Sequence, residues 1–543
     1  MLSERSKPAD HVAESVGPPV RKIVSFGSVG LRDAAISLSL ANLCLLNTWR
    51  STIFNRHHEY FFQIPNYAPR YAASLLNLLL LAVTFWLAIF FARKSKKGVC
   101  LDLVKVVFLM VLLVPLNFVR KFVLDWSVNE VLHFGTPAIT AALALSTIVL
   151  TIRFHRRVAA FAAVTVLMLV PFCAVTMVRT SWFLSKSTWK PNADEKQLPP
   201  MRETQRANEP RLLWIIFDEL DQRVAFEKRN SGIELPNLNR FCNGALVATN
   251  AFPPAGTTLL SIPALTTGRL VAEAIPVSLS QMSLRFAGDG RLVKWSEAEN
   301  VFSRARADGF NTAIVGWYHP YPRVFGRNLN AAEWSAIPSI DAFGGGNISH
   351  CVATQLLIDF WPFYEMRLFT KLYADSVLRC ARLVTNSAFG LTLLHLSIPH
   401  TPVVHESIGG HIASVFAHPG GADYLNNLYW VDVTFGQLRL AMEQMELWDK
   451  TTVLVSSDHW WRTSKQLDRI TDHRVPFILK LANSIEPIVY RKQFNTVISA
   501  DLITAVLKKE IQNTSEICSW LDQHESSGQY AYAPDGSLMK SGF

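Results

Sequence analysis

Two acidic pairs are the first residues in this sequence that could do chemistry. Asp218-Glu219 follows a short apolar run, with Asp221 close behind, and Asp458-His459 follows another such run. Carboxylate oxygens together with an imidazole nitrogen are ligands that suit zinc or manganese. A charged residue at the end of a strand is more often simply solvated. Composition alone therefore leaves both a metal site and a solvated strand end open.

Hydroxyl and imidazole side chains lie in the same half of the chain. Thr257 and Thr258 precede an apolar segment, where a hydroxyl commonly caps a helix. A helix N-terminus stabilises a capping oxygen and a bound phosphate alike, so capping and catalysis are compatible. Imidazoles can move a proton near neutral pH. The histidines that could do so, each equally well a structural residue on the sequence alone, are His395, His400, His405 and His473.

Strands and helices alternate through this half of the chain and would position these residues. The apolar runs predicted as strands are Leu212–Phe217, Asn311–Trp317, Leu391–Ser397, Thr451–Ser457 and Val475–Lys480, and one helix is predicted at Asp423–Leu447. This alternation predicts an α/β fold around a central, mainly parallel sheet. Ligands bind at the carboxyl edge of such sheets, where Asp218 and Asp458 would converge.

Five segments, in family order, resemble the sulfatases of the alkaline phosphatase superfamily. They are LLWIIFDELD, LPNLNRFCNGALVATNAFPPAGTTLLSIPALTTGR, DGFNTAIVGWYH, HLSIPHTP and LWDKTTVLVSSDH. The resemblance extends from about Arg211 to Lys480. It implies an alkaline-phosphatase-like catalytic domain over residues 211–510, followed by a C-terminal tail over 511–543.

The resemblance also implies roles for single residues. The metal ligands of the family match Asp218, Glu219, Asp458 and His459, although Asp221 competes with Glu219 for its place. His400 matches the histidine that contacts the transferred group. His473 lies where relatives place a further histidine or lysine.

Thr258 matches the family's nucleophile position, counted back from Thr267-Gly268-Arg269, with Thr257 as the alternative. The surrounding residues also resemble the T-x-x-S-x-P pattern of phosphoethanolamine transferases. Formylglycine-dependent sulfatases need Cys or Ser followed by x-Pro-x-Arg, so sulfatase chemistry proper is not expected here. A threonine hydroxyl needs metal coordination to act as a nucleophile, which adds Thr258 to the predicted ligands.

One tightly bound divalent metal is predicted, zinc or manganese rather than calcium or magnesium. Relatives with a second metal use an Asp and a His four residues later, whereas here Asp432 is followed by Gly436. Arg462 could pair with an anionic group of the substrate. Trp460, with Trp461, stands where sulfatases more often have Gly. It either lines the substrate site, stacking on a sugar or acyl chain, or packs in the core.

The first 210 residues predict a membrane domain. Two uncharged segments, Tyr71–Ala92 and Val158–Val178, are long enough to cross a hydrocarbon core of about 30 Å. Three less clean segments bring the predicted count to five helices over residues 31–178: Leu31–Trp49, Gly98–Val119 and Phe134–Ile152. Residues 1–30 are then a cytoplasmic tail, and residues 179–210 an interfacial segment and linker.

Charge sets the predicted orientation. Residues 1–210 hold 24 Lys and Arg against 12 Asp and Glu, and the rest of the chain holds 29 against 31. Basic clusters at 93–97 and 153–157 should face the cytoplasm, which places the catalytic domain outside a bacterial inner membrane. The basic excess thus belongs to the membrane domain, and no nucleic-acid partner is expected. Seven scattered cysteines form no C-x-x-C pair, and Cys351 and Cys380 are either a disulfide or free thiols.

A helical anchor with an external domain of this kind resembles phosphoethanolamine transferases and the glycerol-phosphate transferases related to lipoteichoic acid synthase. That resemblance implies transfer of a phospholipid headgroup, phosphoethanolamine or phosphoglycerol, onto an envelope glycan or lipid through a phospho-threonine. Two alternatives remain: an envelope phosphodiesterase or phosphatase, and a non-catalytic envelope scaffold that has kept the fold.

Overall fold

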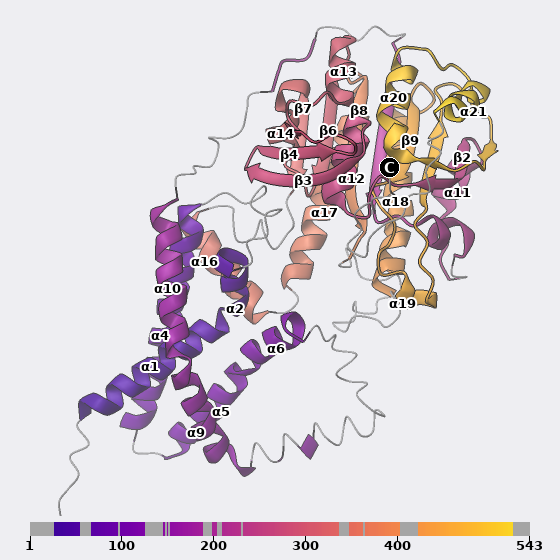
Figure 1. Cartoon of the computed structure of the whole chain (residues 1–543). Coiled ribbons are helices and arrows are strands. Elements are labelled where there is room, and N and C mark those ends of the chain that lie inside the picture. Colours follow the sequence, from indigo (N-terminus) through magenta and orange to yellow (C-terminus); the bar gives the residue numbers. More distant parts are fainter. Residues whose placement is uncertain are drawn as a thin grey trace, which may run out of the picture.

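The computed structural model describes residues 26–54, 67–95, 98–124, 145–146, 149, 153–187, 198–202, 209–229, 232–335, 347–361, 364–401 and 422–524. Figure 1 shows two parts, a group of N-terminal helices and a larger α/β domain. The helices of the first part are α1 (Phe26–Cys44), α2 (Leu46–Trp49), the π-helix η1 (Arg50–Phe54), α4 (Ala68–Lys94), α5 (Gly98–Val111), α6 (Leu113–Phe122), α9 (His155–Met168) and α10 (Val170–Ser185).

The described residues contain two helices long and apolar enough to cross a membrane, Ala68–Lys94 and Gly98–Phe122. A third span is obtained if His155–Met168 and Val170–Ser185, which are bent by 42° at their junction, count as one. The prediction of five spans is therefore wrong in number. Most of the predicted span Phe134–Ile152 lies outside the described residues.

Helix α1, predicted as the first span, is long enough but too polar to pass as one. Several of its polar side chains, Asp33 and Asn42 among them, are buried against neighbouring helices. Asp33 pairs with Arg93 of α4 at 2.7 Å. Asn42 accepts a hydrogen bond of 2.6 Å from the Thr176 hydroxyl of α10. Polar pairs of this kind hold helices together when little water is present to compete.

The α/β domain is built on a nine-stranded sheet of order β11-β2-β10-β9-β1-β8-β6-β7, with β12 pairing to β2. Its strands are β1 (Leu212–Asp218), β2 (Leu246–Phe252), β6 (Thr312–Trp317), β7 (Ala331–Ser335), β8 (Leu391–Pro399), β9 (Thr452–Ser457), β10 (Val475–Lys480), β11 (Ile488–Tyr490) and β12 (Phe494–Asn495). All five predicted strands are present. Strands β9, β1, β8, β6 and β7 are parallel, and β10 runs antiparallel to both neighbours, so the sheet is mainly parallel as predicted.

Helices cover both faces of this sheet because its central strands are apolar on both sides. In β1, Trp214 and Ile216 pack into one core while Ile215 and Phe217 pack into the other. The first core is closed by α12 (Thr258–Thr267), α13 (Val301–Ala307), α20 (Ser499–Leu507) and α21 (Thr514–Gln523). The second is closed by α11 (Pro236–Cys242), α17 (Tyr364–Val384) and α18 (Ala422–Gln444).

The remaining elements are peripheral. A separate antiparallel sheet contains β3 (Val271–Ser278), β4 (Gln281–Phe286) and β5 (Leu292–Lys294). Short helical segments are the π-helix η2 (Arg223–Glu227), α14 (Tyr321–Phe325), α19 (Lys465–Asp468) and the 3-10 turns η3 (Gly326–Asn328) and η4 (Thr496–Ile498).

Helix α21 lies beyond the predicted domain end near Glu510. Its Ile517 and Leu521 are fully buried in the first core, so the packed domain continues to this helix. All seven cysteines are free thiols, and Cys351 and Cys380 are both buried.

Helix α16 (Ile348–Phe360) connects the two parts of the molecule. It precedes α17 in the chain but packs against α4 and α2. Its Gln355 Oε1 lies 3.1 Å from Asn77 Nδ2, and its Asp359 accepts a 2.6 Å hydrogen bond from the Thr48 hydroxyl. The α/β domain is thereby docked on the candidate membrane helices through one of its own helices.

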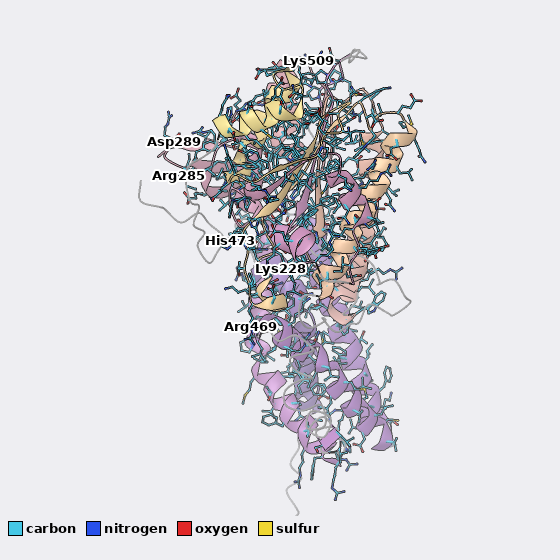
Figure 2. The ribbon with its side chains drawn as sticks, turned by 90° about the vertical axis from the view of Figure 1, so that its right-hand side faces the viewer. Lys228, Arg285, Asp289, Arg469, His473 and Lys509 are labelled. Atoms are coloured by element: carbon cyan, nitrogen blue, oxygen red, sulfur yellow. The ribbon has the colours of Figure 1, made fainter. Side chains whose placement is uncertain are left out.

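The carboxyl edge of the parallel strands is on the side of these helices. In Figure 1, α19, which follows β9, lies at the end of the domain nearer to them, and α13 and α20 lie at the far end. Figure 2 shows the same arrangement from the side: Lys228 and Arg469 lie at the end of the domain nearer to these helices, and Lys509 lies at the end away from them. Residues at the carboxyl ends of β1 and β9 therefore face the candidate membrane helices.

Candidate metal centre and nucleophile

Four of the predicted site residues converge at the carboxyl edge of the sheet. Asp218 ends β1, Asp458 and His459 follow β9, and Thr258 begins α12. Strands β1 and β9 are adjacent and parallel, which brings their ends together. All four side chains are buried, with Thr258 only 7% exposed.

The two candidate threonines are distinguished by the backbone. Thr257 is the extended residue before α12, with φ −143° and ψ 142°, and its side chain makes no capping hydrogen bond. The Thr258 hydroxyl instead points into the group. Its Oγ1 lies 3.4 Å from Asp218 Oδ2 and 3.3 Å from His459 Nε2.

His459 completes the cluster. Its Nε2 lies 3.6 Å from Asp218 Oδ1 and 3.5 Å from Asp458 Oδ2. Its Nδ1 lies 3.0 Å from the Trp460 carbonyl oxygen. A carbonyl can only accept, so the proton of the neutral ring is on Nδ1 and the lone pair of Nε2 faces the carboxylates. Burial lowers the pKa of His459 to about 3, which keeps the ring neutral.

The buried carboxylates of Asp218 and Asp458 favour the binding of a cation. Burial and the neighbouring Asp458 charge raise the pKa of Asp218 well above its usual range, and burial also raises the pKa of Asp458. Asp218 Oδ1 and Asp458 Oδ2 are buried and have no hydrogen-bond partner. Two adjacent buried carboxylates with unpaired oxygens are costly unless a metal ion neutralises them.

The spacing of these atoms fits such an ion. Ligands at about 2.0–2.2 Å from a tetrahedral zinc ion lie about 3.3–3.6 Å from one another. The separations among Thr258, His459 and the two carboxylates, 3.3–3.6 Å, fall in this range. Asp218, His395 and Asp458 also form a buried group whose ligand atoms lie within 4.8 Å of each other, so this edge of the sheet could bind a metal.

Glu219, another predicted ligand, is at the same edge, and its Oε1 lies 4.0 Å from His459 Nδ1. Its backbone is left-handed, with φ 65°, and its Oε1 accepts a 2.9 Å hydrogen bond from Arg462 Nε. Arg462, predicted to bind substrate, therefore neutralises this carboxylate. Asp221, the competing acid, accepts the backbone N–H of Val224 at 2.9 Å.

The histidines predicted to act on substrate lie at different distances from the cluster. The His400 backbone N–H donates to the Asp218 carbonyl at 3.2 Å, and its ring lies 5.7 Å from that of Trp317. His473 packs instead against Trp460, with ring centroids 4.3 Å apart. Trp460 is only 5% exposed, which favours the core-packing alternative for this residue. His405 lies outside the described residues.

Two further histidines lie near the group: His319, which the sequence did not indicate, and His395, which the sequence indicated only as a candidate for proton transfer. His319 Nε2 lies 3.1 Å from the Thr258 carbonyl oxygen, at the first turn of α12. Its only sequence signal is its place just after the predicted strand Asn311–Trp317. His395 is fully buried within β8, where a histidine gives no positional signal.

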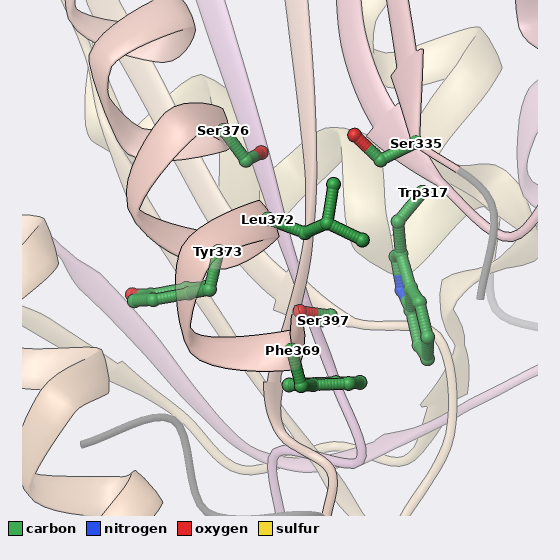
Figure 3. A pocket seen from close by; sticks show the side chains of 7 residues that line it. All are labelled: Trp317, Ser335, Phe369, Leu372, Tyr373, Ser376 and Ser397. Carbon is green, nitrogen blue, oxygen red and sulfur yellow. The ribbon is translucent and has the colours of Figure 1, made fainter. Parts of the chain in front are cut away.

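A hollow of about 300 Å³, open solvent included, is lined in part by Trp317, whose ring lies 5.7 Å from that of His400. Figure 3 shows its lining, which comes from β6, β7, β8 and α17: Trp317, Ser335, Phe369, Leu372, Tyr373, Ser376 and Ser397. None of these seven side chains is charged.

Fold and site together define an alkaline-phosphatase-type enzyme with a candidate metal centre at the carboxyl edge of its sheet. The sulfatase family model matches residues 210–508, more than half of the chain, and the chain therefore belongs to the sulfatase family of that superfamily. A search of the curated proteins gave no match.

Three solved structures are similar to part of this chain at low identity. A protein of the alkaline phosphatase superfamily from Vibrio parahaemolyticus is 15% identical, with 59% of this chain and 71% of that chain covered and a TM-score of 0.35. The phosphonate monoester hydrolase of Agrobacterium radiobacter is 12% identical, with coverage of 55% and 74% and a TM-score of 0.33. A sulfatase from Pseudoalteromonas sp. is 15% identical, with coverage of 56% and 69% and a TM-score of 0.37.

Proposed function

We propose that this protein is a membrane-anchored phosphotransferase that moves a phospholipid-derived headgroup onto an envelope glycan or lipid through a phospho-threonine at Thr258. The observation that carries the proposal is the position of the Thr258 hydroxyl, buried between Asp218 and His459 at the N-terminus of α12. A buried hydroxyl among candidate metal ligands is placed to act as a nucleophile. A hydroxyl that only caps a helix would instead accept a hydrogen bond from a backbone N–H.

In the proposed reaction, Thr258 Oγ forms a bond to phosphorus while the bond from phosphorus to the diacylglycerol oxygen breaks. Two groups near the hydroxyl can accept its proton, His459 Nε2 at 3.3 Å and Asp218 Oδ2 at 3.4 Å. His400, at the edge of the site, protonates the departing oxygen or orients the acceptor alcohol. The acceptor alcohol then attacks the phospho-threonine and regenerates the Thr258 hydroxyl.

Asp218, Asp458, His459 and Thr258 would hold the divalent metal, zinc or manganese. When bound, such an ion lowers the pKa of a coordinated hydroxyl and neutralises charge on the phosphoryl oxygens. The N-terminus of α12 adds its own partial positive charge for a phosphate group.

Phosphate is favoured over sulfate by the nucleophile itself. The formylglycine of sulfatases is made from Cys or Ser, and Thr258 supplies neither. A lipid substrate is supported by the side on which the site lies, since the carboxyl edge of the sheet faces the candidate membrane helices (Figure 2). An anchored site meets membrane lipids at high effective concentration.

The test is mass spectrometry of the peptide that contains Thr258. The purified, zinc-loaded chain is incubated with vesicles containing phosphatidylethanolamine and phosphatidylglycerol, without acceptor, and then digested. We expect an adduct on Thr258 whose added mass is that of phosphoethanolamine or phosphoglycerol. The mass would name the transferred group.

The adjacent residue provides a matched control. Thr257→Ala should form the adduct and Thr258→Ala should not, while both remain folded and metal-bound. An adduct that survives Thr258→Ala would overturn the assignment of the nucleophile. Release of free headgroup phosphate without any acceptor would instead identify the protein as a hydrolase.

A further inference from the structure

His395 is a buried histidine whose outer nitrogen has no partner although it lies beside two carboxylates. Its side chain is fully buried, and its Nε2 makes no hydrogen bond. Asp218 Oδ1 and Asp458 Oδ2 are likewise buried without partners. The ligand atoms of these three residues lie within 4.8 Å of one another. Three unpaired polar groups that meet in one buried space are explained by a shared ligand.

Tyr321 fixes the orientation of this ring. Its hydroxyl lies 2.6 Å from His395 Nδ1, and the tyrosine is itself fully buried. The two residues come from different elements, since Tyr321 begins α14 and His395 lies within β8. A partner on Nδ1 leaves only Nε2 to face the carboxylates.

Gly316 of β6 makes this contact possible. A Cβ atom at this position would lie 2.2 Å from Tyr321 Cε2, so any other residue would push the tyrosine ring away. The ring of Tyr321 packs directly on the backbone of β6 and reaches the neighbouring strand β8. The backbone of one strand thus sets the side-chain position on the next.

We propose that His395 Nε2 is an additional protein ligand of the metal ion and that Tyr321 is its positioning residue, which accepts the Nδ1–H hydrogen bond. This inference concerns the metal site on which the proposed function depends. Metal-bound histidines usually donate their other N–H to a fixed oxygen, which selects the tautomer with a free lone pair.

A second imidazole changes which metal the site favours. With His395, the site holds two imidazoles, His395 and His459, beside the carboxylates of Asp218 and Asp458. Imidazole nitrogens favour zinc, whereas calcium, magnesium and manganese prefer oxygen ligands.

The test measures metal binding by the full-length, detergent-purified protein and uses no catalytic readout. Zinc affinity is obtained by competition with a chromophoric chelator, and ligand type from the visible absorption spectrum of the cobalt-substituted protein. Loss of an outer partner of a metal-bound histidine typically costs 10–100-fold in metal affinity. We therefore expect a loss of about 10–100-fold for Tyr321→Phe and a larger loss for His395→Gln, each with a changed cobalt spectrum.

Tyr373→Phe is the matched control, since it removes the hydroxyl of another buried tyrosine, one that bonds to Thr434. It should change neither zinc affinity nor the cobalt spectrum. Wild-type affinity and spectrum in both His395→Gln and Tyr321→Phe would overturn the proposal and make His395 a packed core residue. That result would leave the Thr258 adduct intact, so it is distinguishable from failure of the proposed function.

Discussion

At the scale of single residues, the site is defined by which oxygen atoms lack a partner. Asp218 and Asp458 each have one buried oxygen without a hydrogen bond, whereas the Glu219 carboxylate is paired with Arg462 at 2.9 Å. An unpaired buried carboxylate oxygen is available to a metal ion at no cost in broken bonds. A paired one must first lose its partner.

This difference predicts unequal effects of two conservative substitutions. Asp218→Asn should weaken zinc binding by on the order of 100-fold or more, and Glu219→Gln by less than about tenfold, because metal-bound ligands matter more than outer ones. Competition with a chelator measures both, and the thermal unfolding of the metal-free proteins controls for misfolding. Equal losses of zinc affinity in the two variants would show that Glu219 is also a metal ligand.

The sequence predicted the residues that stand at strand ends better than those inside strands. Asp218, Asp458 and His459 each interrupt an apolar run, and such an interruption is visible in the sequence. His395 lies within β8, and whether its side chain meets Asp218 depends on the register of β8 with β1, which places Leu394 opposite Ile215. Tyr321 reaches it only because residue 316 lacks a side chain. Neither fact has a local sequence signal.

At the scale of elements, Asp432 shows how a possible second metal ligand is used for packing. From α18 it accepts backbone N–H groups of α11, from Asn237 at 3.2 Å and from Leu238 at 2.8 Å. These N–H groups belong to the first turn of α11, which has no capping side chain of its own. Gly436, one turn later, lets Asn237 approach to where a Cβ would be 2.6 Å away. The pair Asp432 and Gly436 therefore docks one helix on another.

Asp432→Ala should accordingly act on stability and leave the metal content unchanged. Loss of a capping acid costs about 0.5–2 kcal/mol. Denaturant unfolding measures this loss, and elemental analysis of the purified variant measures the number of metals per chain. A fall in metal content at normal stability would show that Asp432 is a ligand after all.

At the scale of the whole molecule, the packing of α16 against α4 could not be predicted from the sequence. The strand pattern places it inside the catalytic domain, yet its Gln355 contacts α4 through Ser74 and Asn77, at 3.3 and 3.1 Å. The number of spans was overpredicted for a related reason. Helix α1 was counted as a span although it is too polar for one, and the sequence does not show that its Asp33 and Asn42 contact other helices.

The docking of α16 should determine how well the site reaches lipids. Gln355 is fully buried, and Gln355→Ala leaves the side chains of Ser74 and Asn77 without this partner. Lost hydrogen bonds of this kind cost about 1–3 kcal/mol, and a coupling free energy of that size corresponds to about 5–150-fold in a population. We expect turnover of a phospholipid in vesicles to fall by a factor within this range. Turnover of a small soluble phosphodiester should change little, because the Thr258 site remains intact.

Ser349→Ala, at an exposed position on the same helix, is the control and should affect neither substrate. Equal loss with both substrates would mean that α16 supports the fold of the catalytic domain and does not position it over the membrane.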